Sequence, residues 1–193
     1  MSCQCLKSTA IALKTRVYLH LGDYNNVIAE ATKLVPAAPP FQYSAGSVTH
    51  KLETNIATVF GGGYIGNEAI FTIPFANSTT ETPPAQSSLA FNYLAQPIIF
   101  LTAAGIAANT ALNNAADART GLIGINAAKQ KVLRKFTITT APFRDYVPVI
   151  RYAEVLLNYA EAAANNNDLV TATALLKAVR NRADVAYVFA DAD

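Results

Sequence analysis

Two carboxylates, Glu154 and Glu161, have a spacing that invites comparison with acid–base catalytic pairs. Seven residues apart on a helix, they would share one face at about 10 Å along the axis. Glycoside hydrolysis places its two carboxyl groups about 5–5.5 Å or about 6.5–9.5 Å apart, so this pair is too widely spaced for the first geometry and slightly too wide for the second. Arg151, three residues before Glu154, provides an ordinary helix ion pair instead. We therefore predict structural roles for both glutamates and no catalytic residue.

A glycine-rich run, Gly61-Gly-Gly-Tyr-Ile-Gly66, matches the spacing of dinucleotide-binding loops. That chemistry requires a helix directly after the run, because the N-terminus of the helix holds the pyrophosphate. The residues that follow, Asn67 to Pro74, have β-strand character and include a proline. The sequence therefore predicts a flexible loop here and no cofactor.

Histidines and cysteines are too few and too scattered to predict a metal site. His20 and His50 are the two histidines, and neither has a cysteine or carboxylate at metal-ligand spacing, so each is expected at the surface or at a helix end. A disulfide between Cys3 and Cys5 would be severely strained, and two thiols without nearby histidines do not make a zinc site.

Two helical hairpins are predicted at the two ends of the chain, in residues 6–35 and 148–183. In the first, Gly22 and Asp23 have the residue types of a helix C-terminus and of the next N-cap. In the second, an amphipathic helix entered through Pro148 covers residues 149–163, and a polar turn over residues 165–168 leads to its partner. Helical spacing assigns these apolar residues to the buried faces of the first hairpin: Leu6, Ala10, Leu13, Val17 and Leu21, then Val27, Ile28, Ala31, Leu34 and Val35. It assigns these to the second: Ile150, Ala153, Leu157, Ala160 and Ala164, then Leu169, Ala172, Leu175, Leu176 and Val179.

Residues 36–147 have a different composition and are predicted to be a long, loop-rich insert. Residues 36–49 and 76–88 are rich in Pro, Ser, Thr and Gly and are expected to be loops. Short strands are expected at residues 68–75 and 131–139, and a weak helix at about 104–115. The fold class is therefore mainly α, with hairpins similar to tetratricopeptide (TPR) repeats and an insert that contains short strands. Residues 1–193 are expected to form a single domain or a fragment of one, and residues 184–193 a tail.

Composition narrows the class of partner. Apolar residues make up 52% of the 193 residues and charged residues 15%, which favours a folded chain with a sizeable core. The formal charge of +2 with no basic cluster argues against nucleic acid as the main partner. The sequence has no apolar run of the length that spans a membrane and no recognisable signal peptide.

Five sequence motifs, in order along the chain, resemble those of the SusD/RagB family of Bacteroidetes outer-membrane nutrient-binding lipoproteins. They are Ala12-Leu…Gly-Asp-Tyr24, Asn67-Glu-Ala-Ile-Phe-Thr-Ile-Pro74, Asp117-Ala-Arg119, Lys135-Phe136 with Pro148-Val-Ile-Arg151, and the helix of residues 149–163 with Ala178-Val-Arg-Asn-Arg-Ala183. Family members are longer at both ends, so the resemblance implies a truncated member. The resemblance also implies a chain that binds without catalysis.

If the resemblance holds, the chain captures an oligosaccharide, or a peptide, at the outer-membrane surface and delivers it to a TonB-dependent transporter. Attachment to the membrane would then depend on a lipid anchor that this chain does not show. Two alternatives stay open: a TPR-like protein-interaction scaffold without a small-molecule ligand, and a glycan-active enzyme that uses Glu154 and Glu161.

Three tyrosines in the insert are the candidate ligand contacts. Glycan-binding sites commonly present flat aromatic rings to the apolar C–H faces of sugars, flanked by amide and hydroxyl groups. Tyr43, Tyr64 and Tyr93 lie in the irregular insert, near Gln42, Asn67 and Asn92 respectively. We expect Phe41, Phe75 and Phe91 to bury the loops that carry them.

Overall fold

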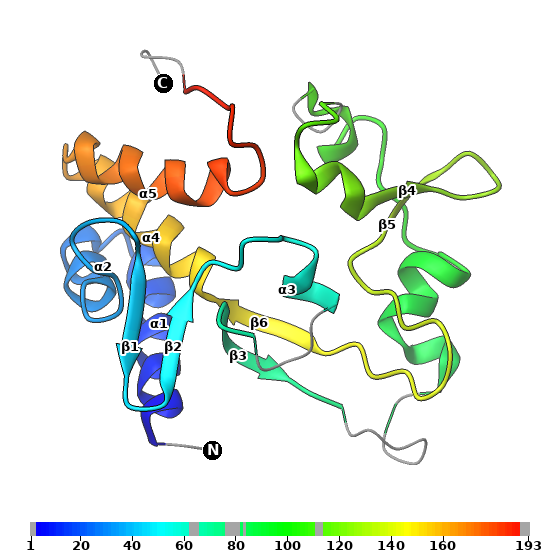
Figure 1. The fold of residues 1–193 in the computed structure, drawn as a ribbon, viewed down its shortest axis with the longest axis horizontal. Coiled ribbons are helices and arrows are strands. Elements are labelled where there is room, and N and C mark those ends of the chain that lie inside the picture. Colours follow the sequence, from blue (N-terminus) through cyan, green and yellow to red (C-terminus); the bar gives the residue numbers. More distant parts are fainter. Residues whose placement is uncertain (1–2, 62–65, 76–81, 83, 111–113, 190–193) are drawn as a thin grey trace. The chain divides into compact units, whose positions relative to one another are not determined.

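The computed structural model describes residues 3–61, 66–75, 82, 84–110 and 114–189, and these residues divide between two compact units (Figure 1). Unit 1 consists of Met1–Thr54, Gly66–Thr72 and Pro148–Asp193, and unit 2 of Asn55–Ile65 and Ile73–Val147. Unit 1 therefore contains both helical hairpins together with parts of the predicted insert.

The first hairpin consists of α1 (Cys3–His20) and α2 (Tyr24–Ala31). Gly22 has a φ of +70°, a backbone conformation that glycine adopts without a steric penalty, and it turns the chain after α1. The side chain of Asp23 then accepts a hydrogen bond from the backbone N–H of Asn26 at 3.2 Å and caps α2. Both predicted roles in this turn are confirmed.

The second hairpin consists of α4 (Tyr152–Asn165) and α5 (Leu169–Asn181), drawn in yellow to orange in Figure 1. Asp168 caps α5 by accepting from the backbone N–H of Thr171 at 3.1 Å. Helices α1 and α2 both pack against α4, so the two hairpins share one core. None of the helices in the described parts of the chain is long and apolar enough to cross a membrane.

The core of unit 1 agrees with the predicted apolar face of α2 and disagrees with that of α1. Val27, Ala31, Leu34 and Val35 are all buried. The predicted face of α1 is wrong, because Leu6, Leu13, Val17 and Leu21 are exposed. The face of α1 that is buried instead contains Ser8, Ile11, Ala12 and Thr15. In the second hairpin the prediction is partly wrong, because these members of its predicted faces are exposed: Leu157, Ala164, Leu169 and Leu176.

Two short pairs of strands complete unit 1. β1 (Gln42–Ala45) and β2 (Val48–Lys51) form an antiparallel hairpin with Tyr43 opposite His50, where the sequence predicted loops. β3 (Ala69–Ile73) lies within the predicted strand and pairs with β6 (Val147–Arg151). The predicted start of the second hairpin is therefore wrong, because residues 149–151 belong to a strand and α4 begins at Tyr152. The β-branched residues Val147, Val149 and Ile150 suit this extended conformation.

Unit 2 contains short elements around a small core formed by Val59, Phe60 and Leu122. A hairpin of β4 (Ile123–Ile125) and β5 (Lys131–Leu133) provides its antiparallel strands. The predicted strand of residues 131–139 therefore ends early. In the described part of the predicted helix at 104–115, Ile106–Ala108 and Thr110 have 3-10 geometry in place of an α-helix. The short helical elements of unit 2 are α3 (Thr58–Gly61), η1 (Ala85–Ser87), η2 (Phe91–Ala95), η3 (Ile106–Ala108) and η5 (Ala118–Leu122).

Candidate functional site

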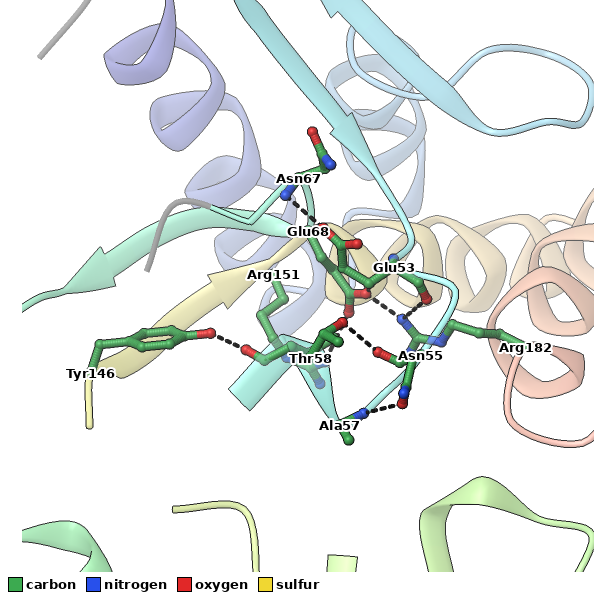
Figure 2. Close-up of polar contacts among 10 residues, drawn as sticks. Glu53, Asn55, Ala57, Thr58, Asn67, Glu68, Tyr146, Arg151 and Arg182 are labelled. Carbon is green, nitrogen blue, oxygen red and sulfur yellow. Dashed lines mark hydrogen bonds and ion pairs between the residues drawn. The ribbon is translucent and has the colours of Figure 1, made fainter. Parts of the chain in front are cut away.

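A buried carboxylate, Glu68, joins three of the sequence motifs in unit 1 (Figure 2). Its side chain is 2% exposed and accepts a hydrogen bond from Arg151 at 2.9 Å and another from Arg182. Arg151 is the N-cap of α4 and Arg182 the C-cap of α5, and Glu68 directly precedes β3. One carboxylate therefore connects the start of one helix to the end of its partner.

Backbone groups complete the surroundings of Glu68. The backbone N–H of Glu53 donates to the Glu68 carboxylate at 3.1 Å, and the Glu68 carbonyl accepts from the N–H of Tyr152 at 2.8 Å. The neighbouring carboxylate of Glu53 accepts from the N–H of Asn67 at 2.8 Å. A buried charge is costly unless it is paired and hydrogen-bonded, and here both conditions are met. This network of Glu68, Arg151, Arg182, Glu53 and Asn67 is a structural anchor and leaves no carboxylate oxygen of Glu68 available for acid–base chemistry.

Glu154 forms a second ion pair that joins the two hairpins. Both of its carboxylate oxygens accept from Arg16 of α1, at 2.6 and 2.8 Å, and Arg16 also donates to the carbonyl of Val149 at 2.7 Å. Hydrogen bonding to Glu154 raises the pKa of the Arg16 guanidinium. Glu154 therefore pairs with Arg16, and Arg151, its expected partner, binds Glu68. Glu161 is exposed on the same helix.

His50 lies inside unit 1, where the sequence predicted a surface position. Its imidazole is 4% exposed and is stacked between Tyr43 and Tyr152, with ring centroids 6.0 and 6.2 Å away. Burial lowers the pKa of His50, and the backbone of Asn67 acts in the opposite direction. Tyr152 is fully buried, its hydroxyl donates to the carbonyl of Leu34 at 2.9 Å, and burial raises its pKa. The prediction was wrong because the absence of metal ligands near His50 in the sequence carries no information about its packing against Tyr43 and Tyr152. His20 is exposed at the end of α1, as expected.

The three candidate tyrosines have different surroundings. Tyr43 is half-buried on β1, against His50 and the core of unit 1. Tyr93 is half-buried on η2 in unit 2, with its ring 5.7 Å from that of Phe136. Tyr64 lies outside the described residues. Tyr43 and Tyr93 thus belong to different units, and their roles as ligand contacts stay predictions.

Two of the three amides expected beside these tyrosines, those of Gln42 and Asn92, form hydrogen bonds within the protein. The side-chain amide of Asn92 donates to the carbonyls of Gln86 and Ser88 at 3.0 and 2.9 Å. The side-chain amide of Gln42 donates to the Ser44 hydroxyl at 3.5 Å. The Asn92 amide therefore stabilises the backbone at residues 86–88, and the Gln42 amide contacts a side chain on its own strand, β1.

The glycine-rich run lacks the context that dinucleotide binding needs. Residues 62–65 lie outside the described part of the chain, and β3 follows Gly66 where a helix would be required. Among the described residues, no group of three or more His, Cys, Asp and Glu side chains is placed to hold a metal ion.

Comparisons with known proteins were made for the sequence and for the fold. Residues 102–192 match the SusD family. No curated protein matches the sequence significantly. A SusD superfamily protein from Bacteroides fragilis has 29% sequence identity and a TM-score of 0.74, over 93% of this chain and 38% of its own.

Two further solved structures share the fold. A sugar-binding protein described for Bacteroides vulgatus has 21% identity and a TM-score of 0.71, over 93% of this chain and 40% of its own. A laminarin-binding SusD-like protein has 18% identity and a TM-score of 0.64, over 91% of this chain and 47% of its own. The chain thus spans less than half the length of these structures. The matches confirm the resemblance to the SusD/RagB family and the mainly α, SusD-like fold.

Proposed function

We propose that this SusD-like chain binds an oligosaccharide without altering it chemically and delivers it to a TonB-dependent transporter at the outer-membrane surface. The observation that carries the proposal is the SusD-like fold over more than nine-tenths of the chain, with SusD-family sequence in residues 102–192. One protein of similar fold is described as laminarin-binding, which supports a glycan in preference to a peptide.

The ion pairs of unit 1 support binding without catalysis. Glu154 is held by Arg16, and Glu68 by Arg151 and Arg182, so neither carboxylate is placed to shuttle a proton. A glycan-active enzyme built on Glu154 and Glu161 would need the first of these to leave its ion pair. A Glu154→Gln variant that lost measurable glycan turnover would contradict this part of the proposal.

Tyr43, Tyr64 and Tyr93 are proposed as ligand contacts, and the surroundings of Tyr43 and Tyr93 rank those two for testing. Tyr43 stacks on a buried histidine, so its removal would disturb the β1–β2 hairpin as well as any ligand contact. Tyr93 lies on the short element η2 and is not among the residues of the small core of unit 2, so it is the sharper probe.

The test is calorimetric titration of the folded chain with plant, host and microbial oligosaccharides, alongside Tyr93→Ala and Tyr64→Ala. If either ring stacks on the sugar, its removal should weaken binding by about tenfold. Tyr18→Ala, a half-buried tyrosine of α1, is the control and should bind as the parent does. Absence of heat with every glycan would contradict the proposal and favour the protein-interaction scaffold.

Delivery to a transporter needs its own measurement, because calorimetry tests only the ligand. Co-purification from outer-membrane extracts of the native host, with the natural full-length protein as bait, should recover a TonB-dependent transporter. Recovery of the bait alone, from a preparation that still binds glycan, would contradict this step and leave glycan binding standing.

A further inference from the structure

Positive charge is concentrated in unit 2, although the chain as a whole is close to neutral. Unit 2 contains six of the fifteen lysines and arginines and three of the thirteen acidic residues, which gives it a formal charge of +3. Unit 1 contains the remaining nine lysines and arginines and the remaining ten acidic residues, which gives it a formal charge of −1. The small net charge of the sequence therefore conceals an uneven distribution.

The acidic residues in the described part of unit 2 are buried. Asp117 is fully buried and accepts from the backbone N–H and the guanidinium of Arg119, at distances between 2.6 and 3.1 Å. Asp145 is buried and accepts from the backbone N–H groups of Thr137 and Ile138 at 3.3 and 3.0 Å. The charged side chains that this part of unit 2 presents to solvent are consequently cations.

Four of those cations, Lys129, Lys131, Arg134 and Lys135, lie in and directly after the β4–β5 hairpin. The backbone that carries them is fixed: the N–H of Arg134 donates to the carbonyl of Leu122 at 2.7 Å, and the carbonyl of Lys131 accepts from the N–H of Leu101 at 3.0 Å. A fixed backbone lowers the entropy that a ligand must remove from the site when it binds.

The side chain of Arg134 lies against β4 at Gly124. A Cβ atom at Gly124 would come within 2.6 Å of Arg134 Cδ, so the absence of a side chain there allows the arginine stem to lie against the strand. The side chain remains exposed. Its planar fork of N–H donors matches the geometry of carboxylate and sulfate groups.

Aromatic rings adjoin this basic segment. Phe136 follows Lys135 directly and packs with Tyr93, and Lys135 Nζ lies 4.7 Å from the centre of the Phe60 ring. Rings can cover the C–H face of a sugar, while neighbouring cations bind its acidic substituents. A neutral glycan would gain less from these cations than an acidic one, because it has no anionic group to pair with them.

We propose that the β4–β5 hairpin, with Arg134 and the Tyr93–Phe136 pair, binds an acidic oligosaccharide that bears carboxylate or sulfate groups. This inference rests on the proposed function and narrows its ligand class. Nucleic acid would also be attracted by the charge, but the SusD-like fold favours the glycan, and the test separates the two.

The experiment is calorimetric titration of the full chain with four probes of similar length: oligogalacturonides, heparin-derived sulfated oligosaccharides, neutral laminari-oligosaccharides and a single-stranded oligonucleotide. At least one acidic glycan should bind more tightly than the neutral one, and its affinity should fall as salt is raised. Arg134→Gln, which keeps most of the side-chain stem, should weaken that binding by about tenfold. Lys177→Gln, on the exposed face of α5 in unit 1, removes the same charge and should leave it unchanged.

Each other result counts against the inference in a distinguishable way. Equal binding of neutral and acidic glycans, insensitive to Arg134→Gln, would overturn the acidic site and leave the proposed function intact. Binding of no glycan would overturn both. An equal loss in the Lys177→Gln variant, or tighter binding of the oligonucleotide, would indicate general charge attraction and overturn the acidic-glycan site.

Discussion

Helices α1 and α4 come from different hairpins but pack against each other in unit 1, and they bury different kinds of side chain. α4 buries large residues, among them Tyr152, Val155 and Leu156, which are fully inaccessible. Apart from Ile11, the residues that α1 buries are small or polar, and its Leu6 and Leu13 are 57% and 48% exposed. Apolar spacing misplaces the buried side of α1 and only partly identifies that of α4, where Ala153 and Ala160 are buried but Leu157 and Ala164 are exposed.

The polar groups at their interface explain the difference. The buried amide of Asn158 on α4 donates to the Thr15 hydroxyl at 3.1 Å, and Thr15 donates in turn to the carbonyl of Ala12 at 2.8 Å. Beside them, Arg16 binds Glu154. Small residues such as Ser8 and Ala12 allow the helices to approach closely enough for these bonds. A helix is therefore oriented by its partnered polar residues as well as by its apolar ones.

The largest effect should come from Glu68, whose carboxylate accepts from Arg151 at the N-terminus of α4. In Glu68→Gln, Arg151 and the buried Arg182 lose their anionic partner, and the free energy of unfolding should fall by about 3–5 kcal/mol. Urea unfolding followed by circular dichroism measures this. Glu161→Gln removes an exposed carboxylate from α4 itself and should change stability by less than about 0.5 kcal/mol. Similar values for the two variants would show that the Glu68 network does not anchor the helices.

A pair of leucine substitutions tests the comparison directly. Leu156→Ala on α4 removes a fully buried side chain and should cost about 2–5 kcal/mol. Leu13→Ala on α1 removes a side chain that is half exposed, and it should cost less than about 1 kcal/mol. Equilibrium unfolding of both variants provides the measurement. A loss at Leu13 as large as that at Leu156 would mean that the leucine face of α1 is buried in the folded protein.

Thr15→Val tests whether the buried hydrogen bond between Thr15 and Asn158 stabilises the packing of α1 on α4. Valine has nearly the same shape as threonine but cannot accept the hydrogen bond from Asn158, whose amide would then be buried without a partner. A buried donor without an acceptor costs about 1–3 kcal/mol, which should appear as a lower urea midpoint. Thr173→Val, an exposed position on α5, is the matched control. If both variants unfold at the parent midpoint, the hydrogen bond does not orient α1.

The sequence predicted correctly those features that depend only on neighbouring residues. Gly22 and Asp23 form a turn by their own backbone and capping preferences, and the buried face of α2 follows from its apolar spacing. The β1–β2 hairpin was missed because its composition is typical of loops, whereas its pairing depends on Tyr43, His50 and their packing on Tyr152. Distant packing of this kind leaves no periodic signal.

The anchor at Glu68 was missed for a related reason. Its partners Arg151 and Arg182 lie 83 and 114 residues later in the chain, so no local spacing connects them. The available signal was indirect: a glutamate before a strand, an arginine before a helix and an arginine after one, all within motifs that resemble one family. The expectation of no basic cluster was wrong: four cations lie close together in residues 129–135, and the small net charge, which averages over both units, gave no sign of them.

The smallest expected effect concerns His50, whose stacking on Tyr152 joins the β1–β2 hairpin to α4. Burial lowers the pKa of His50 in the folded chain, so the unfolded chain takes up a proton at a higher pH. As the pH falls below about 6.5, the ordinary histidine value, unfolding is therefore accompanied by proton uptake and the free energy of unfolding decreases. Urea unfolding at pH 7.5 and at pH 5.5 should show this loss in the parent chain and a smaller one in His50→Phe, which keeps an aromatic ring between the tyrosines. His20→Gln, at the exposed end of α1, should lose as much stability as the parent, and an equal loss in all three would place the responsible group elsewhere.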